Sequence, residues 1–231
     1  MNNKRIVLES IEDLVCEIEG HDKVTGLHSR RVEPYFAVFA KRLMQEPKYR
    51  RELVGHDFDI IVACSGLHDV GKLRVLKTTL TKRDKLSDEE FMELRTHPSQ
   101  GVGHLEYYEK ITGVDLPLAK IMAGEHQEKW DGGGYPNRLQ GEKIHLLGRI
   151  MAIVDTYEAI VANRPYRENM KGSTHEEAFQ EVVKSFGTQL DPNLENVFKD
   201  CEKAFKHENN KINYEEEYKQ LMEKEVEAGI S

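Results

Sequence analysis

The stretch Phe58-Asp-Ile-Ile-Val-Ala-Cys-Ser-Gly-Leu-His68-Asp69-Val70-Gly71-Lys72 is the most informative segment of the chain. Its first ten residues are mostly apolar, a pattern typical of a buried helix. A histidine and an aspartate then follow side by side. Neighbouring residues on a helix point about 100° apart, so His68 and Asp69 can flank one cation only near a helix end or with further ligands. The dyad therefore needs partners elsewhere in the sequence.

The composition excludes several classes of protein. The chain has 231 residues, with 33 basic and 41 acidic side chains and a formal net charge of −8. This length suits one large domain, or one domain with an appendage. No apolar run approaches the roughly 20 residues of a membrane-spanning helix, and no signal-peptide core follows the N-terminus. An acidic chain also lacks the basic face of a DNA-coating protein. We expect neither a membrane nor a DNA partner.

The cysteines and histidines point to different conclusions. Cys16, Cys64 and Cys201 are scattered and form no CxxC pair, so we expect no disulfide framework and no thiolate zinc site. This usage favours a cytoplasmic location. Ten histidines are present, and imidazole is a common metal ligand. Scattered surface histidines are the alternative interpretation. We expect His21, His56, His104, His145, His175 and His207 to be surface or ordinary hydrogen-bonded residues.

Helical periodicity dominates the chain. Apolar residues recur at intervals of three and four over residues 7–18 and 32–43, as amphipathic helices require. Pro34 is compatible with the second of these helices only in its first turn. Residues 146–161 carry apolar side chains on more than one face, which predicts a central helix.

Two capping boxes mark further helix starts. Ser87 with Glu90, and Ser173 with Glu176, have the required spacing of three residues. Gly187 is expected to end the helix that Ser173 opens.

Strands are nearly absent from the prediction, the one candidate being a short segment at residues 139–144. The predicted class is therefore all-α. We divide the chain into an N-terminal helix (1–20), one domain (21–206) and an acidic, helical tail (207–231). The N-terminal helix could belong to the fold or form a homodimer contact. The tail carries seven acids against three bases from Glu208 onward, and a solvated helix is favoured over a functional acidic patch.

Four further elements accompany the dyad. They are Thr25-Gly-Leu-His28-Ser-Arg-Arg-Val, His97-Pro98, His126-Gln-Glu-Lys-Trp-Asp-Gly-Gly-Gly-Tyr-Pro136, and Asp155 in the apolar helix. An ionised Asp155 in a buried helix must be paired or metal-bound, because unpaired burial costs several kcal/mol. A salt bridge from Asp155 to Arg149 or Arg164 is the alternative.

Together these motifs resemble the HD-GYP family of the HD phosphohydrolase superfamily, named for the His-Asp dyad and the Gly134-Tyr135-Pro136 turn. The resemblance extends from about Asp22 to about Pro192. It implies that residues 21–206 form an HD-GYP domain, an HD-type helical bundle with a C-terminal helical extension. It also implies two divalent metal ions bridged by Asp69. The remaining ligands that it implies are His28, His68 and Asp155 for one ion, and His97 and His126 for the other.

Imidazole and carboxylate ligands without thiolate suit iron, manganese or zinc, and octahedral sites of mixed nitrogen and oxygen ligands favour iron or manganese. Two positions depart from the family pattern. The usual pair of consecutive histidines is His126-Gln127 here, and an amide oxygen is a poorer ligand than imidazole. We therefore expect a weak second metal site. Members with three metals carry a glutamate where this chain has Val24, so we expect no third ion.

The resemblance implies hydrolysis of cyclic di-GMP to pGpG, GMP or both by a metal-activated hydroxide. Asp69 and Lys72 would be catalytic, with Lys72 contacting a substrate phosphate. Arg164 and Arg167 could each donate paired hydrogen bonds to phosphate oxygens. Salt bridges at a helix end are the alternative for both arginines. The Gly134-Tyr135-Pro136 turn would shape the substrate site and contact GGDEF-type diguanylate cyclases, although a purely structural turn is the alternative.

Residues 72–85 hold six bases against one acid, which favours approach of an anion next to the dyad, or a solvated basic loop. Trp130 is expected to pack in the core rather than stack on guanine. Two other functions stay open at this point. One is a catalytically weakened member that acts as a cyclic dinucleotide receptor or a partner-binding module, and the other is a di-iron oxygenase of the same superfamily.

Overall fold

A computed structural model describes residues 2–82, 84–162, 172–214 and 216 of the chain. Within these residues every regular element is a helix, and the only strand-like pairing is an isolated bridge between Phe186 and Leu190. The predicted all-α class is confirmed. The candidate strand at residues 139–144 is wrong, because this segment forms the short 3-10 helix η2 (Gly141–Lys143) and makes no ladder.

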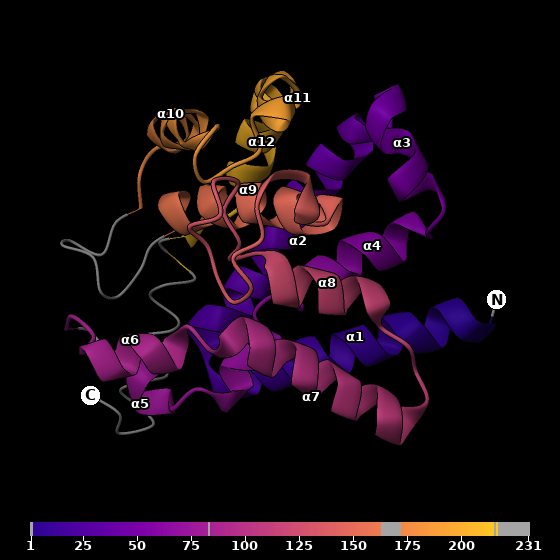
Figure 1. The fold of residues 1–231 in the computed structure, drawn as a ribbon, viewed down its shortest axis with the longest axis vertical. Coiled ribbons are helices and arrows are strands. Elements are labelled where there is room, and N and C mark those ends of the chain that lie inside the picture. The colour runs from indigo at the N-terminus through magenta and orange to yellow at the C-terminus, as the bar shows by residue number, and fades with distance from the viewer. Residues whose placement is uncertain (1, 83, 163–171, 215, 217–231) are drawn as a thin grey trace.

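The helices follow one another in the order shown in Figure 1. Their bounds are α1 (Asn2–His21), α2 (Lys23–Leu43), α3 (Pro47–Val54), α4 (Phe58–Ser65), η1 (Val70–Arg74), α5 (Lys77–Leu80), α6 (Asp88–Leu94), α7 (His97–Thr112), α8 (Pro117–Glu125), α9 (Leu146–Val161), α10 (His175–Ser185), η4 (Pro192–Leu194), α11 (Glu195–Asp200) and α12 (Glu202–Asn209). No helix among the described residues has the length and apolarity that crossing a membrane requires.

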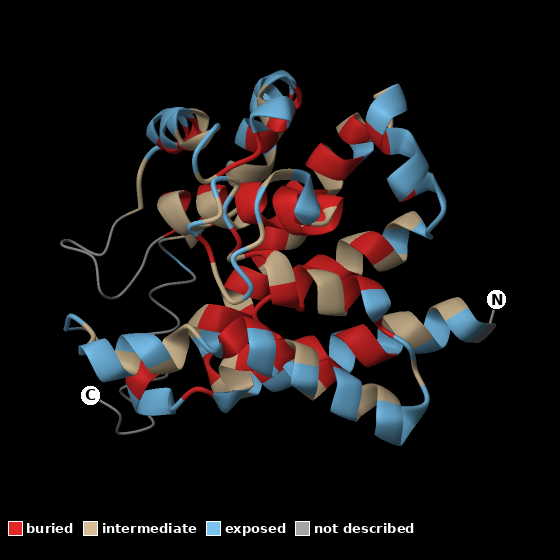
Figure 2. Ribbon diagram, in the orientation of Figure 1, coloured by how far each residue is buried: buried red, intermediate tan, exposed pale blue. Residues whose placement is uncertain are grey.

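Helices α2 and α9 form the centre of the molecule and pack against each other. Figure 2 shows both as largely buried, with α4 and α8 beneath them and α10 to α12 above. The prediction of a central helix over residues 146–161 is confirmed, since most of α9 is buried. Helix α1 packs on α2 and contributes Ile11, Leu14, Val15 and Ile18 to the core, so it is part of this fold.

Helix α2 begins earlier than predicted. Asp22 is its N-cap, and the Asp22 carboxylate accepts hydrogen bonds from the Thr25 amide (2.8 Å) and hydroxyl (2.5 Å). Such a cap satisfies backbone donors that no helical carbonyl can reach. Pro34 consequently lies inside α2 and not in its first turn. The expectation for Pro34 is wrong, because the helix continues through the proline although the Arg30 carbonyl loses its usual donor.

The capping predictions had mixed outcomes. Ser87 and Glu90 form the expected box at the start of α6. The second box is shifted by one residue, because Thr174 with Glu177, rather than Ser173 with Glu176, caps α10. Helix α10 ends at Ser185, and Gly187 follows with a φ of 88°. The expected tail helix falls mostly outside the described residues.

Glu33 provides a pH test of this packing. Its carboxyl lies against Gly66 in the turn before His68, and burial raises its pKa to about 7. The folded state therefore binds this proton more tightly than the unfolded chain. Its contribution to stability is greatest below the unfolded value of 4.5 and is lost as the pH rises through about 7.

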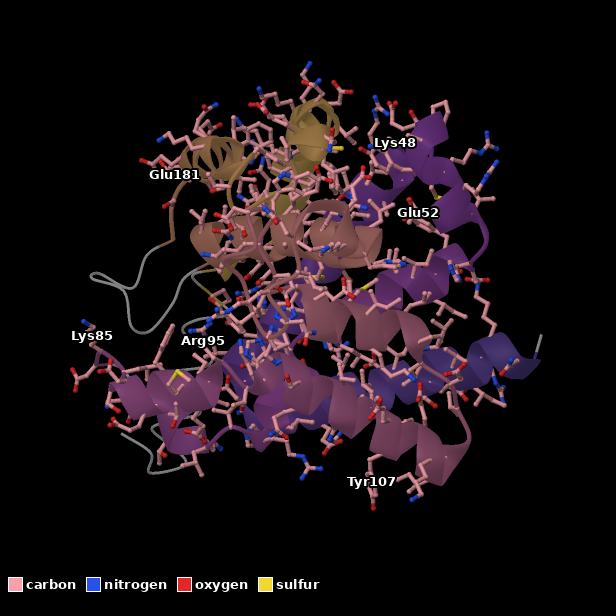
Figure 3. All side chains as sticks on the ribbon, in the orientation of Figure 1. Lys48, Glu52, Lys85, Arg95, Tyr107 and Glu181 are labelled. Carbon is pink, nitrogen blue, oxygen red and sulfur yellow. The ribbon has the colours of Figure 1, made fainter. Side chains whose placement is uncertain are left out.

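We expect Glu33→Gln to stabilise the protein at pH 8 by up to about 3 kcal/mol and to change little at pH 4.5. Urea unfolding at both pH values measures this. Glu52→Gln on the exposed surface of α3 (Figure 3) is the control. Equal stability of wild type and Glu33→Gln at pH 8 would contradict the prediction.

Candidate metal centre

Five segments that are distant in sequence meet at one buried cluster. Helix α2 supplies His28, and the turn after α4 supplies His68 and Asp69. His97 is the first residue of α7, His126 caps the C-terminus of α8, and Asp155 lies in α9. All four histidines and Asp69 are at most 3% exposed. The structure thus brings together the six side chains that the sequence analysis named as metal ligands.

Asp69 divides the cluster into two halves. Its Oδ2 lies 3.6 Å from His28 Nε2 and 3.4 Å from His68 Nε2. Its Oδ1 lies 3.4 Å from His97 Nε2 and 3.7 Å from His126 Nε2. Each oxygen of one carboxylate therefore faces its own pair of imidazoles, which is the arrangement of a carboxylate that bridges two ions.

The imidazoles are oriented for metal binding. The two Nε2 atoms are 3.0 Å apart in the pair His28–His68 and 3.1 Å apart in the pair His97–His126. Nδ1 of each ring faces an oxygen acceptor: Glu158 Oε2 for His28, Ser65 O for His68, Leu94 O for His97, and Met122 O for His126. Because these acceptors require the proton on Nδ1, each neutral ring turns its Nε2 lone pair toward the centre.

Lone pairs at such distances repel unless a cation lies between them. Two ligands at about 2.1 Å from one ion and roughly 90–110° apart are separated by about 3.0–3.4 Å. The observed spacings match this separation, so the residues present fit a pair of divalent ions.

The charge states favour the same conclusion. Burial lowers the pKa of His68, and it lowers that of His97 to about 3, so both rings are neutral ligands at physiological pH. Burial acts to raise the pKa of Asp69, but the neighbouring Lys72 ammonium outweighs burial and holds this pKa well below its usual range. The Lys72 Nζ donates to Asp69 Oδ2 at 2.6 Å.

Asp155 completes the first half of the cluster. Its Oδ1 lies 3.1 Å from His28 Nε2. The alternative of a salt bridge with Arg149 fails, because Arg149 pairs with Asp191 at 2.6 Å. Arg164, the other alternative partner, and Arg167 lie outside the described residues.

Gln127 occupies the position at which the resemblance leads us to expect a second histidine. Its Nε2 donates to Asp155 Oδ2 at 3.4 Å, and its Oε1 accepts from the Tyr135 hydroxyl at 2.9 Å. The amide oxygen is therefore engaged by the Gly134-Tyr135-Pro136 turn. Gly134 is required there, since a Cβ at this position would lie 2.3 Å from the Lys129 amide nitrogen.

Sequence reasoning missed two residues of this site. Glu158 is fully buried, accepts from His28 Nδ1 at 2.5 Å and pairs with Arg31 at 3.4 Å. It lies one turn after Asp155 on the apolar helix, so the same argument about a buried charge could have found it. Arg95 stacks over the Tyr135 ring, with 4.6 Å between Cζ and the ring centroid. Figure 3 shows Arg95 at the inner end of α6, toward the middle of the molecule.

The other predicted residues lie farther out. Three lysines of the basic stretch, Lys72, Lys82 and Lys85, line one pocket beside the cluster. Trp130 is partly buried and packs against the Gly141 turn. Among the described residues, none of the six other histidines joins a group of potential metal ligands.

Comparison with known proteins places these motifs in a family. The sequence pattern of the HD domain matches residues 25–194. A cyclic di-GMP phosphodiesterase of Vibrio cholerae is 36% identical over 85% of this chain and 40% of its own length. A 3'3'-cGAMP-specific phosphodiesterase 2 of the same organism is 34% identical over 80% of this chain and 33% of its own length.

The Thermotoga maritima cyclic di-GMP phosphodiesterase is 35% identical over 85% of this chain and 50% of its own length. The chain thus spans between a third and a half of these curated relatives. With the dyad, the four other candidate ligands and the Gly134-Tyr135-Pro136 turn present, the chain belongs to the HD-domain family and, within it, to the HD-GYP group.

Proposed function

We propose that this chain is a metal-dependent phosphodiesterase that hydrolyses cyclic di-GMP to pGpG, GMP or both. The observation that carries this proposal is the Asp69 carboxylate, which faces a different histidine pair with each oxygen. Relatives named as phosphodiesterases of cyclic di-GMP and of 3'3'-cGAMP support the substrate class. A mixed guanine–adenine dinucleotide is the second substrate to be tested.

A pair of divalent ions, for which we propose iron or manganese, would neutralise phosphate charge and activate water. The first ion would be held by His28, His68, Asp69 and Asp155. The second would be held by Asp69, His97 and His126. Glu158 keeps the proton of His28 on Nδ1 and so fixes the ring orientation.

Substrate contacts are assigned to basic side chains at the rim of the cluster. The Lys72 ammonium contacts Asp69 Oδ2 and therefore lies beside the cluster, where a substrate phosphate would approach the metal centre. The planar guanidinium of Arg95 stacks on the Tyr135 ring. A guanidinium can donate two parallel hydrogen bonds to the oxygens of a phosphate. We retain Arg164, Arg167 and the Gly134-Tyr135-Pro136 turn as substrate-binding residues by resemblance.

The test is hydrolysis by protein loaded anaerobically with Mn²⁺ or Fe²⁺. We expect linear dinucleotide or mononucleotide from cyclic di-GMP, and loss of turnover after chelation with recovery on adding metal back. Cyclic GMP–AMP and cyclic di-AMP run in parallel determine which dinucleotide is preferred. Absence of product with either metal from any of the three substrates would overturn the proposal.

We expect the side chain at position 127 to determine how tightly the second metal ion is bound. We expect Gln127→His to raise the metal content of anaerobically purified protein from roughly one toward roughly two equivalents, because imidazole is a stronger ligand than an amide. Elemental analysis of both proteins measures this. Gln127→Asn, which shortens the amide without adding a ligand, is the control, and equal metal content in wild type and Gln127→His would contradict the prediction.

A second candidate function follows from the same residue. A weak second site favours a cyclic dinucleotide receptor or a partner-binding module, with the Gly134-Tyr135-Pro136 turn meeting a GGDEF-type diguanylate cyclase. Tight calorimetric binding of cyclic di-GMP without turnover would favour this function over the enzyme. A homodimer is compatible with either function.

A further inference from the structure

A pocket of about 450 Å³ opens directly beside the metal centre. Its inner wall is Lys72, whose Nζ contacts Asp69. A second wall is the first turn of α2, where Val24 lies one helical turn before His28. A volume of this size is typical of small-molecule sites. Of the residues that line this pocket, only Lys72 has been given a role in the proposed reaction above.

The lining divides into three chemical parts. Lys72, Lys82 and Lys85 contribute positive charge, and Figure 3 shows Lys85 at the edge of the molecule, beside α6. Leu80, Leu86 and Leu94 contribute apolar surface. Two carboxylates complete the lining: Asp84 lies beside Lys85 in sequence, and Asp22, at the start of α2, is 8% exposed. A nucleotide has the complementary parts: an anionic phosphate, a flat apolar base face and a polar base edge.

The Asp22 carboxylate has one oxygen available for a ligand. Its Oδ2 accepts both hydrogen bonds from Thr25. Among the described residues, no hydrogen bond or ion pair engages Oδ1. An ionised carboxylate only accepts hydrogen bonds. Guanine presents two adjacent N–H donors on its Watson–Crick edge, whereas adenine presents an unprotonated ring nitrogen at the corresponding position. The carboxylate therefore matches guanine and opposes adenine.

We propose that this pocket binds one guanine nucleoside of the cyclic dinucleotide, with the Asp22 carboxylate facing the base edge and with Lys82 and Lys85 facing the second phosphate. This inference rests on the proposed function, because a cyclic dinucleotide with one phosphate at the metal centre must place its other half nearby. It names a base-reading residue and a preference for guanine over adenine at this subsite.

Asp22→Asn is the first test. Asparagine caps helices as well as aspartate does, so the start of α2 is retained while the doubly accepting carboxylate is lost. We expect the ratio of kcat/KM for cyclic di-GMP over cyclic di-AMP to fall at least about tenfold. Asp57→Asn makes the same change at the N-cap of α4, outside the pocket, and is expected to leave the ratio unchanged.

Leu86→Trp is the second test, because it fills the pocket. We expect KM for cyclic di-GMP to rise at least about tenfold, with metal content by elemental analysis unchanged. Leu76→Trp is the matched control, since Leu76 is 64% exposed and does not line the pocket. An unchanged guanine preference in Asp22→Asn together with an unchanged KM in Leu86→Trp would overturn the inference while leaving the proposed function intact.

A binding measurement separates the two proposals. GMP and AMP are titrated by NMR into wild type, Asp22→Asn and Asp57→Asn. The inference expects tighter binding of GMP than of AMP by wild type and Asp57→Asn, and loss of that difference in Asp22→Asn. This result would support the pocket assignment even if no cyclic dinucleotide were hydrolysed. Equal binding of GMP and AMP by wild type would overturn it.

Discussion

Asp69→Asn is expected to remove both metal binding and hydrolysis, although it changes a single atom of the side chain. Asp69 is the residue that faces both histidine pairs, and the amide nitrogen of asparagine cannot act as a ligand. One half of the cluster then loses its carboxylate oxygen. Because two metals supply several kcal/mol of charge stabilisation, we expect turnover to fall by roughly a thousandfold or more.

Two readouts check this expectation. Elemental analysis should find substoichiometric metal in the variant, and thermal unfolding should show that added Mn²⁺ raises the Tm of wild type but not of Asp69→Asn. Asp13→Asn, on the exposed face of α1, is the control for loss of one negative charge. Full metal content and at least a tenth of wild-type turnover in Asp69→Asn would refute the bridging role.

The six side chains that meet at the cluster could be named from the sequence because their motifs resemble the HD-GYP family, and the charge of Asp155 supported the choice independently. Asp155 in an apolar helix demanded a counter-charge, and the structure places it 3.1 Å from His28 Nε2. The basic stretch after the dyad indicated a place for an anion, and three of its lysines line the pocket beside the cluster. Both predictions rested on charged side chains in an unusual sequence context: a carboxylate in an apolar helix, and a run of bases in an acidic chain.

Other features depended on packing that a single sequence does not reveal. Arg95 looks like any helix-end cation until Tyr135, forty residues later, is found beneath it. Gln127 could be identified as a weak ligand, but not as a link between Tyr135 and Asp155. Pro34 was taken to mark the beginning of a helix because proline usually does so, whereas the Asp22 cap shows that α2 starts eleven residues earlier.

Gly71→Ala is expected to destabilise the protein by about 3 kcal/mol or more, and to disrupt the second half of the metal centre. Gly71 lies in η1, which packs closely on α7. A Cβ at this position would lie 1.8 Å from the His97 carbonyl oxygen and 2.5 Å from the Gly101 amide nitrogen. Both neighbours are backbone atoms, so a rotamer change cannot relieve the clash and α7 must move away.

Such a movement would carry His97 away from His126 and Asp69, because His97 is the first residue of α7. Gly103→Ala is the matched control on the same helix, since a Cβ there meets nothing within 4 Å. In an exposed helical position this change should stabilise the protein by up to about 1 kcal/mol. Urea unfolding and metal content measured on both variants check the prediction. If Gly71→Ala matched Gly103→Ala in both measurements, the close contact of η1 with α7 would not be what positions His97.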